Sequence, residues 1–121
     1  MPISDNLMGM GLPGSLAATL GNDPKTVAGA GTTQATATAV YTHNTEITTG
    51  SGATGVRIPT NRSIGSLWYF FNSTATSAIV YAPTGDNLNG AASTTGLTVA
   101  LNKGALLWQY KKNNWASVLT A

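Results

Sequence analysis

The stretch Ser66–Pro83, SLWYFFNSTATSAIVYAP, contains two apolar runs separated by a short polar segment. Five of the nine aromatic residues of the chain lie in it. In an extended first run, Trp68 and Phe70 would point to one side and the apolar residues that flank them to the other. A strand that is apolar on both faces is usually buried on both sides. We therefore expect this strand to lie inside a β-sandwich and beneath a neighbouring subunit or arm.

Most of the remaining chain has the pattern of short strands separated by turns. Threonine favours strands, whereas glycine and asparagine favour turns, and the chain holds 19 Thr, 14 Gly and 10 Asn. About eight short strands with a turn roughly every 8–12 residues are typical of an all-β sandwich or barrel. We predict a single antiparallel, jelly-roll-like β-sandwich domain over residues 25–121. Its expected strands lie at 33–41, 46–49, 55–59, 65–72, 77–82, 97–101, 105–110 and 115–119.

Residues 1–24 differ from the rest and are predicted to form an extended N-terminal arm. The segment 15–20, SLAATL, follows Pro13-Gly14 and precedes Gly21, which predicts a short helical turn. The methionine and leucine side chains of the arm suit irregular apolar grooves, so we expect it to pack on a partner protein or a sister subunit. The residues predicted to make such contacts are Leu7, Met8, Met10, Leu12, Leu16 and Leu20 of the arm, together with Trp68 and Phe70.

Charged residues are scarce. They make up 8% of the chain, against about 25% in an ordinary soluble domain. A surface of Thr and Asn is poorly protected against association, which predicts a protein that works in an assembly. Nucleic-acid binders carry a basic patch, and here only Lys111 and Lys112 are adjacent. The apolar runs are much shorter than the ~18 residues of a membrane span, and no signal peptide is recognisable. We expect neither nucleic acid nor membrane as a partner, and synthesis in a cytosol.

Few groups could carry out catalysis or hold a metal. The chain has no Cys, four acidic residues and one histidine, His43. His43 and Glu46 form the candidate pair for a hydrolase, although a lone histidine at a strand start is usually a surface or hydrogen-bonded residue. One histidine without cysteine cannot form a structural zinc site. The segment 9–14, GMGLPG, matches the dinucleotide fingerprint, but no strand precedes it and no βαβ pattern follows. We expect no enzymatic activity, metal or cofactor.

The C-terminal aromatic residues suggest an alternative function. Trp108, Tyr110 and Trp115 lie beside Lys111 and Lys112, and aromatic rings next to polar donors suit the stacking of sugars. The favoured interpretation is a final hairpin with its aromatic residues packed and its lysines at the turn. A glycan-binding or fibre-attachment β module is the alternative.

Four segments carry a resemblance to a known family. They are LMGMGLP at 7–13, GTTQATA at 31–37, GVRIP at 55–59 and VYAPTGDNLNG at 80–90, of which the last is the most telling. Together they resemble small structural proteins of tailed bacteriophages, of the capsid decoration or cement type. The segments are strand and turn signatures rather than active-site signatures.

The resemblance implies a non-enzymatic protein that binds the major capsid protein on the outer capsid surface and stabilises the lattice. It also implies self-association, with a homotrimer favoured over a dimer because decoration proteins often occupy threefold positions. Each copy would bury apolar area across subunit boundaries at ~25 cal/mol per Å². Repetition over a lattice makes weak individual contacts effective.

Overall fold

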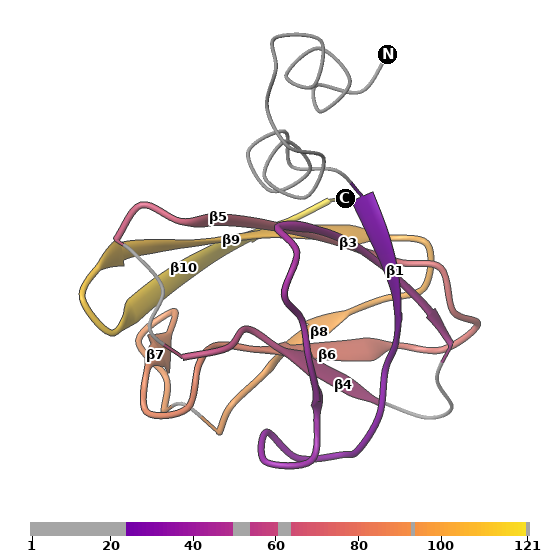
Figure 1. Cartoon of the computed structure of the whole chain (residues 1–121), viewed down its shortest axis with the longest axis horizontal. Coiled ribbons are helices and arrows are strands. Elements are labelled where there is room, and N and C mark those ends of the chain that lie inside the picture. The colour runs from indigo at the N-terminus through magenta and orange to yellow at the C-terminus, as the bar shows by residue number, and fades with distance from the viewer. Residues whose placement is uncertain (1–23, 50–53, 61–63, 93, 121) are drawn as a thin grey trace, which may run out of the picture.

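The computed structural model describes residues 24–49, 54–60, 64–92 and 94–120. Within these residues the chain forms ten β-strands in two facing layers (Figure 1). The strands are β1 (Pro24–Ala28), β2 (Thr38–Ala39), β3 (Asn44–Thr49), β4 (Gly55–Arg57), β5 (Leu67–Asn72), β6 (Ala78–Tyr81), β7 (Asn87–Leu88), β8 (Leu97–Val99), β9 (Gly104–Lys111) and β10 (Asn114–Leu119). One layer is a six-stranded sheet with the order β1-β3-β5-β9-β10-β7, and the other is a four-stranded sheet with the order β2-β4-β6-β8.

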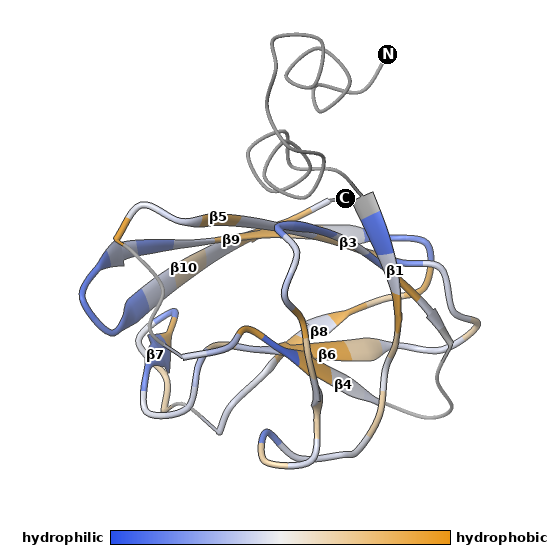
Figure 2. Ribbon diagram, in the orientation of Figure 1, coloured by the Kyte–Doolittle hydropathy of each residue, from blue (hydrophilic) through white to orange (hydrophobic). Residues whose placement is uncertain are grey.

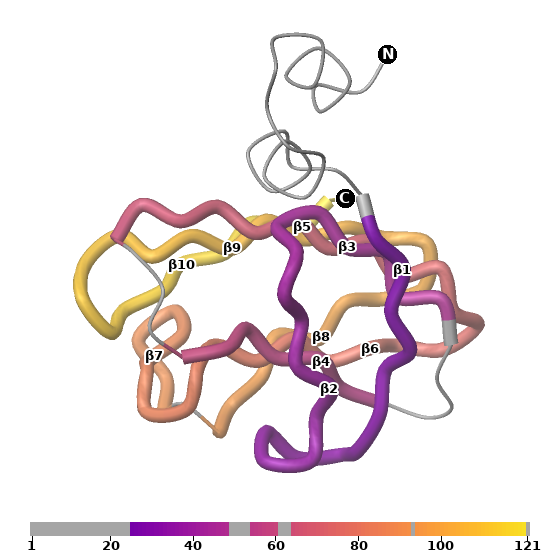
Figure 3. The backbone as a smooth tube through the Cα atoms, in the orientation of Figure 1, coloured from indigo at the N-terminus to yellow at the C-terminus, as the bar shows by residue number. Residues whose placement is uncertain are grey.

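The chain winds between the two sheets as a β-solenoid. β1, β3 and β5 lie side by side and parallel in one sheet, while β2, β4 and β6 do the same in the other. Figure 3 shows the tube passing repeatedly from one layer to the other. Pro24 pairs with Asn44, and Asn44 pairs with Tyr69, so successive turns are 20 (44 − 24) and 25 (69 − 44) residues long.

The predicted antiparallel, jelly-roll-like β-sandwich is therefore wrong, although the all-β class is confirmed. Antiparallel pairing joins β5 to β9, β9 to β10 and β6 to β8, after the parallel turns are complete. Strand lengths and loop residues have the same sequence pattern whether the chain folds back within one sheet, as in a hairpin, or crosses to the other sheet, as in a solenoid. The direction of pairing depends on contacts between residues far apart in sequence, which the local pattern does not report.

The crossing from β5 to β6 is organised by the side chain of Asn72, which has no exposed surface. Its amide nitrogen donates to the carbonyl oxygens of Thr76 (2.8 Å) and Val99 (3.0 Å). Its amide oxygen accepts from the main-chain nitrogen of Thr74 (2.9 Å) and from the Thr74 hydroxyl (2.7 Å). The asparagine thus supplies hydrogen bonds that the strand ladder cannot provide where the chain leaves the sheet. The segment between the two apolar runs becomes an arch between layers.

The strand predicted at 33–41 is mostly a turn, and only β2 within it is extended. The Thr36 hydroxyl accepts from the main-chain nitrogen of Thr33 (3.2 Å), and Ala37 N donates to Thr33 O (3.0 Å). Threonine side chains that bond to nearby main chain compete with a strand ladder, so alternation alone was misleading. β1 and β7 were not predicted as strands. The predicted helical turn at 15–20 lies outside the described residues.

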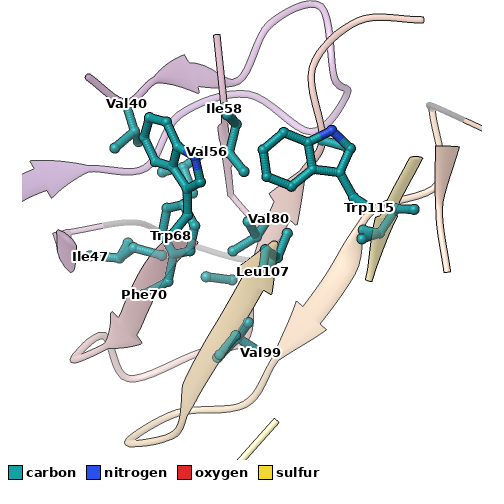
Figure 4. Packing of buried hydrophobic residues seen from close by; sticks show 14 residues of the cluster. Val40, Ile47, Val56, Ile58, Trp68, Phe70, Val80, Val99, Leu107 and Trp115 are labelled. Carbon is teal, nitrogen blue, oxygen red and sulfur yellow. The ribbon is translucent and has the colours of Figure 1, made fainter. Parts of the chain in front are cut away.

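The core fills the space between the sheets. Trp68, Leu107 and Trp115 enter it from the six-stranded sheet, Val56 and Val80 enter it from the four-stranded sheet, and all five are fully buried. Figure 4 shows both indole rings within this cluster. Figure 2 shows hydrophobic colour along the strands of both layers and hydrophilic colour at the turn between β9 and β10. Burying a large apolar side chain contributes about 1.5–3 kcal/mol, so this cluster is the main source of stability.

Candidate interaction surface

The six-stranded sheet carries apolar side chains on the side that faces away from the core. Burial alternates along β5, where Trp68 and Phe70 point inward and the residues between them point outward. The register places Leu67 opposite Trp108 and Tyr69 opposite Leu106, and paired residues point to the same side of a sheet. We call this surface the outer face; it comprises Leu67, Tyr69, Phe71, Leu106, Trp108, Tyr110 and Val118.

The outer face is open to solvent in the folded chain. Phe71 exposes 45% of its surface, Tyr110 exposes 50% and Val118 exposes 56%. A shallow hollow of about 250 Å³ lies over β5, β9 and β10, and its lining includes Tyr69, Leu106 and Val118. Scattered exposed apolar residues are ordinary, whereas a contiguous patch on one sheet marks an interaction site.

Charged groups lie at opposite ends of the outer face. Glu46 on β3 pairs in register with Phe71, and its carboxylate accepts a hydrogen bond from the Ser73 hydroxyl. At the other end, the Lys111 ammonium lies 6.0 Å from the centre of the Tyr110 ring. The face is therefore an apolar centre with an acidic group near one end and a basic group near the other.

The structure places the two core-strand residues predicted to contact a partner, Trp68 and Phe70, inside the protein, with 0% and 3% exposure. The strand presents its other side to solvent instead. An extended strand places alternate residues on opposite sides, but because both sides of this one are apolar, the sequence does not show which side faces the core. The six predicted contact residues of the arm, from Leu7 to Leu20, lie outside the described residues.

His43 and Glu46, the pair considered for a hydrolase, serve separate contacts. His43 Nδ1 lies 2.7 Å from Leu67 O, so this nitrogen carries the proton that it donates to the carbonyl. The imidazole also stacks on the Trp68 indole with 4.2 Å between ring centres. Glu46 bonds Ser73 at the far end of β5. In this arrangement the histidine attaches the start of β3 to β5, and the carboxylate does not orient it.

The three aromatic residues considered for sugar stacking are not on one surface. Trp115 is fully buried, and its indole N–H donates to Asp86 Oδ2 at 2.9 Å. Trp108 and Tyr110 belong to the outer face on β9. A more polar hollow of about 340 Å³ lies beside the β9–β10 turn, with Asp86 and Lys112 in its lining. Trp115 therefore cannot serve as a stacking platform without being drawn out of the core.

In the described part of the chain, no group of three or more His, Cys, Asp or Glu residues is placed to hold a metal ion. The described residues also contain no helix that is long and apolar enough to span a membrane. No protein-family model, curated protein or solved structure matches this chain.

Proposed function

We propose that this chain is a non-enzymatic structural protein of the capsid decoration type, which binds the outside of a tailed-phage head and stabilises its lattice. The observation that supports the proposal is the outer face, because its apolar surface suits a protein that is covered by other protein in its working state. The resemblance of segments such as VYAPTGDNLNG at 80–90 supports the choice of a phage head over other assemblies.

The arrangement of polar groups is in keeping with a scaffold. His43 and Asp86 each bond a neighbouring structural group, Leu67 O and the Trp115 indole respectively. Buried Asn72 and Gln34 bond main-chain carbonyls, as in the 2.9 Å bond from Gln34 to Ala82 O. These side chains join segments of the fold that are far apart in sequence, which makes the body stiff enough to present a fixed surface.

Attachment to the head is assigned to residues 1–24. Leu7, Met8, Met10 and Leu12 fall close together in a segment with glycines at 9 and 11, and such side chains adapt to irregular apolar grooves. Many copies bound to a repeating lattice would hold adjacent capsid subunits together even if each contact is weak.

The test is co-sedimentation of the full-length protein with heads of a tailed phage assembled without it. The test variant carries Leu7→Ser, Met8→Ser, Met10→Ser and Leu12→Ser, and the control carries Ser4→Ala and Asn6→Ala. We expect the wild type and the control to saturate the heads, and the test variant to bind at least about tenfold more weakly, which corresponds to about 1.4 kcal/mol. Heads that bind no wild-type protein would contradict the decoration role. Equal binding of both variants would remove the arm as the anchor.

A further inference from the structure

We propose that the outer face is covered by a second copy of this chain, which packs its own outer face against it about a two-fold axis. The pairing rests on the proposed role in an assembly, but it requires no capsid. Both partners would use the same residues, as in an isologous dimer.

The first argument is the exposed apolar area. An aromatic side chain can bury about 150–250 Å², so the exposed 39% of Tyr69, 45% of Phe71 and 50% of Tyr110 leave about 200–330 Å² uncovered. The exposed 44% of Leu67 and 56% of Val118 together equal about one aliphatic side chain of roughly 60–120 Å². The exposed apolar area of the face is then roughly 260–450 Å². A surrounding polar rim would bring each partner near the roughly 800 Å² of a standard interface.

The second argument is the placement of charge. Glu46 lies at the Phe71 end of the face, and Lys111 lies at the Leu67 end. A two-fold axis that crosses β5 and β9 near Tyr69 reverses the strand direction of the partner. The acidic end of each face then lies over the basic end of the other, and opposite charges at the rim favour this orientation over its alternatives.

The form of the surface favours two copies over the trimer that the resemblance implies. The outer face is one side of a sheet, and one sheet can cover another completely when they pack face to face, about 10 Å apart. Three sheets around a three-fold axis would each leave part of the face open to water.

The first experiment is sedimentation equilibrium of the full-length protein without capsid at micromolar concentration. We expect the mass of a dimer. Phe71→Asp should weaken the dimer at least about tenfold, because it replaces an apolar ring at the Glu46 end of the face with a second carboxylate that the interface would bury. Tyr41→Asp is the matched control: Tyr41 exposes 72% of its surface outside the outer face, and we expect the dimer to be unchanged.

The second experiment remains decisive if Phe71→Asp fails to fold. The natural chain has no cysteine, so Leu106→Cys near the proposed axis can be oxidised to a covalent dimer. Thr98→Cys, an exposed position on β8 in the other sheet, should give none. The proposal would be overturned if the wild type sedimented as a monomer or as a trimer. It would also be overturned if the dimer survived Phe71→Asp and Leu106→Cys formed no disulfide between copies. A monomer with the 106 thiol protected from a water-soluble reagent would identify residues 1–23 as the cover instead. The capsid assay above is independent of these outcomes.

Discussion

Replacement of Asn72 by alanine should destabilise the protein more than any exposed asparagine replacement, because this side chain organises the arch from β5 to β6. Asn72 is fully buried, and its amide bonds both the arch and strand β8 of the four-stranded sheet. Removing the amide leaves the Val99 carbonyl and the Thr74 main-chain nitrogen without these partners. The Thr76 carbonyl keeps its 2.7 Å bond from the Thr74 hydroxyl.

The expected magnitude follows from those two main-chain groups. A buried polar group left without a partner costs about 1–3 kcal/mol, so the variant should lose about 2–4 kcal/mol if water partly replaces the amide. A domain of this size loses about 4 °C in melting temperature per kcal/mol, which gives a decrease of about 8–16 °C. Asn114→Ala is the control, because Asn114 makes a single exposed side-chain bond to Lys112 O (2.8 Å).

Urea unfolding followed by tryptophan fluorescence measures the difference, and Asn72→Asp adds a pH test. The introduced carboxylate would face the carbonyl oxygens of Thr76 and Val99, and burial raises its pKa above the unfolded value. Since the folded state then binds the proton more tightly, this variant should lose stability as pH rises through the folded pKa. Equal unfolding free energies for Asn72→Ala and Asn114→Ala would refute the assigned role of Asn72.

Two further substitutions test the packing of the core. Asp86→Ala should lower the free energy of unfolding, measured in urea, by about 1–3 kcal/mol, because it leaves the buried Trp115 N–H without its acceptor. Asp86→Asn keeps an acceptor and should lose less. Equal losses for the two variants would contradict this account. Gly96→Ala should lower it by about 1–3 kcal/mol, because the added Cβ would lie 2.1 Å from Ile79 Cγ2. Adding Ile79→Ala should recover part of that loss, and strictly additive losses in thermal unfolding would show that the two positions do not clash.

Sequence patterns located several structural features correctly. Turns separate the strands expected at 97–101, 105–110 and 115–119, and Asn102 and Asn113 in these turns adopt positive φ angles of 56° and 62°. Asparagine tolerates this conformation better than most residues, so the signal is local. It was also predicted that Trp68 and Phe70 point to the side of β5 opposite to their neighbours, since period two is a property of any extended chain.

The surface was harder to predict than the strands. The sequence marked β5 as apolar on both sides, but burial of Trp68 rather than Tyr69 depends on which side the four-stranded sheet covers. Trp115 was grouped with Trp108 because both lie in the last hairpin. A register shift between Asn114 and Trp115 pairs Trp115 with Gln109 and turns it into the core, while Trp108 pairs with Ala116 on the other side. A register shift of one residue moves a side chain to the opposite side of the sheet, and local composition does not reveal such a shift.

The sequence alone determined that this chain is all β, that its strands are short and that it carries more apolar surface on β5 than one core can cover. Those properties follow from residue type and from alternation, which act over a few neighbouring residues. Only the tertiary structure decided that β1, β3 and β5 run parallel as turns of a solenoid and that the outer face stays open. Strand direction and facing depend on pairings 20 or more residues apart and on bonds such as those of Asn72 to Val99, which exist only once the chain has folded.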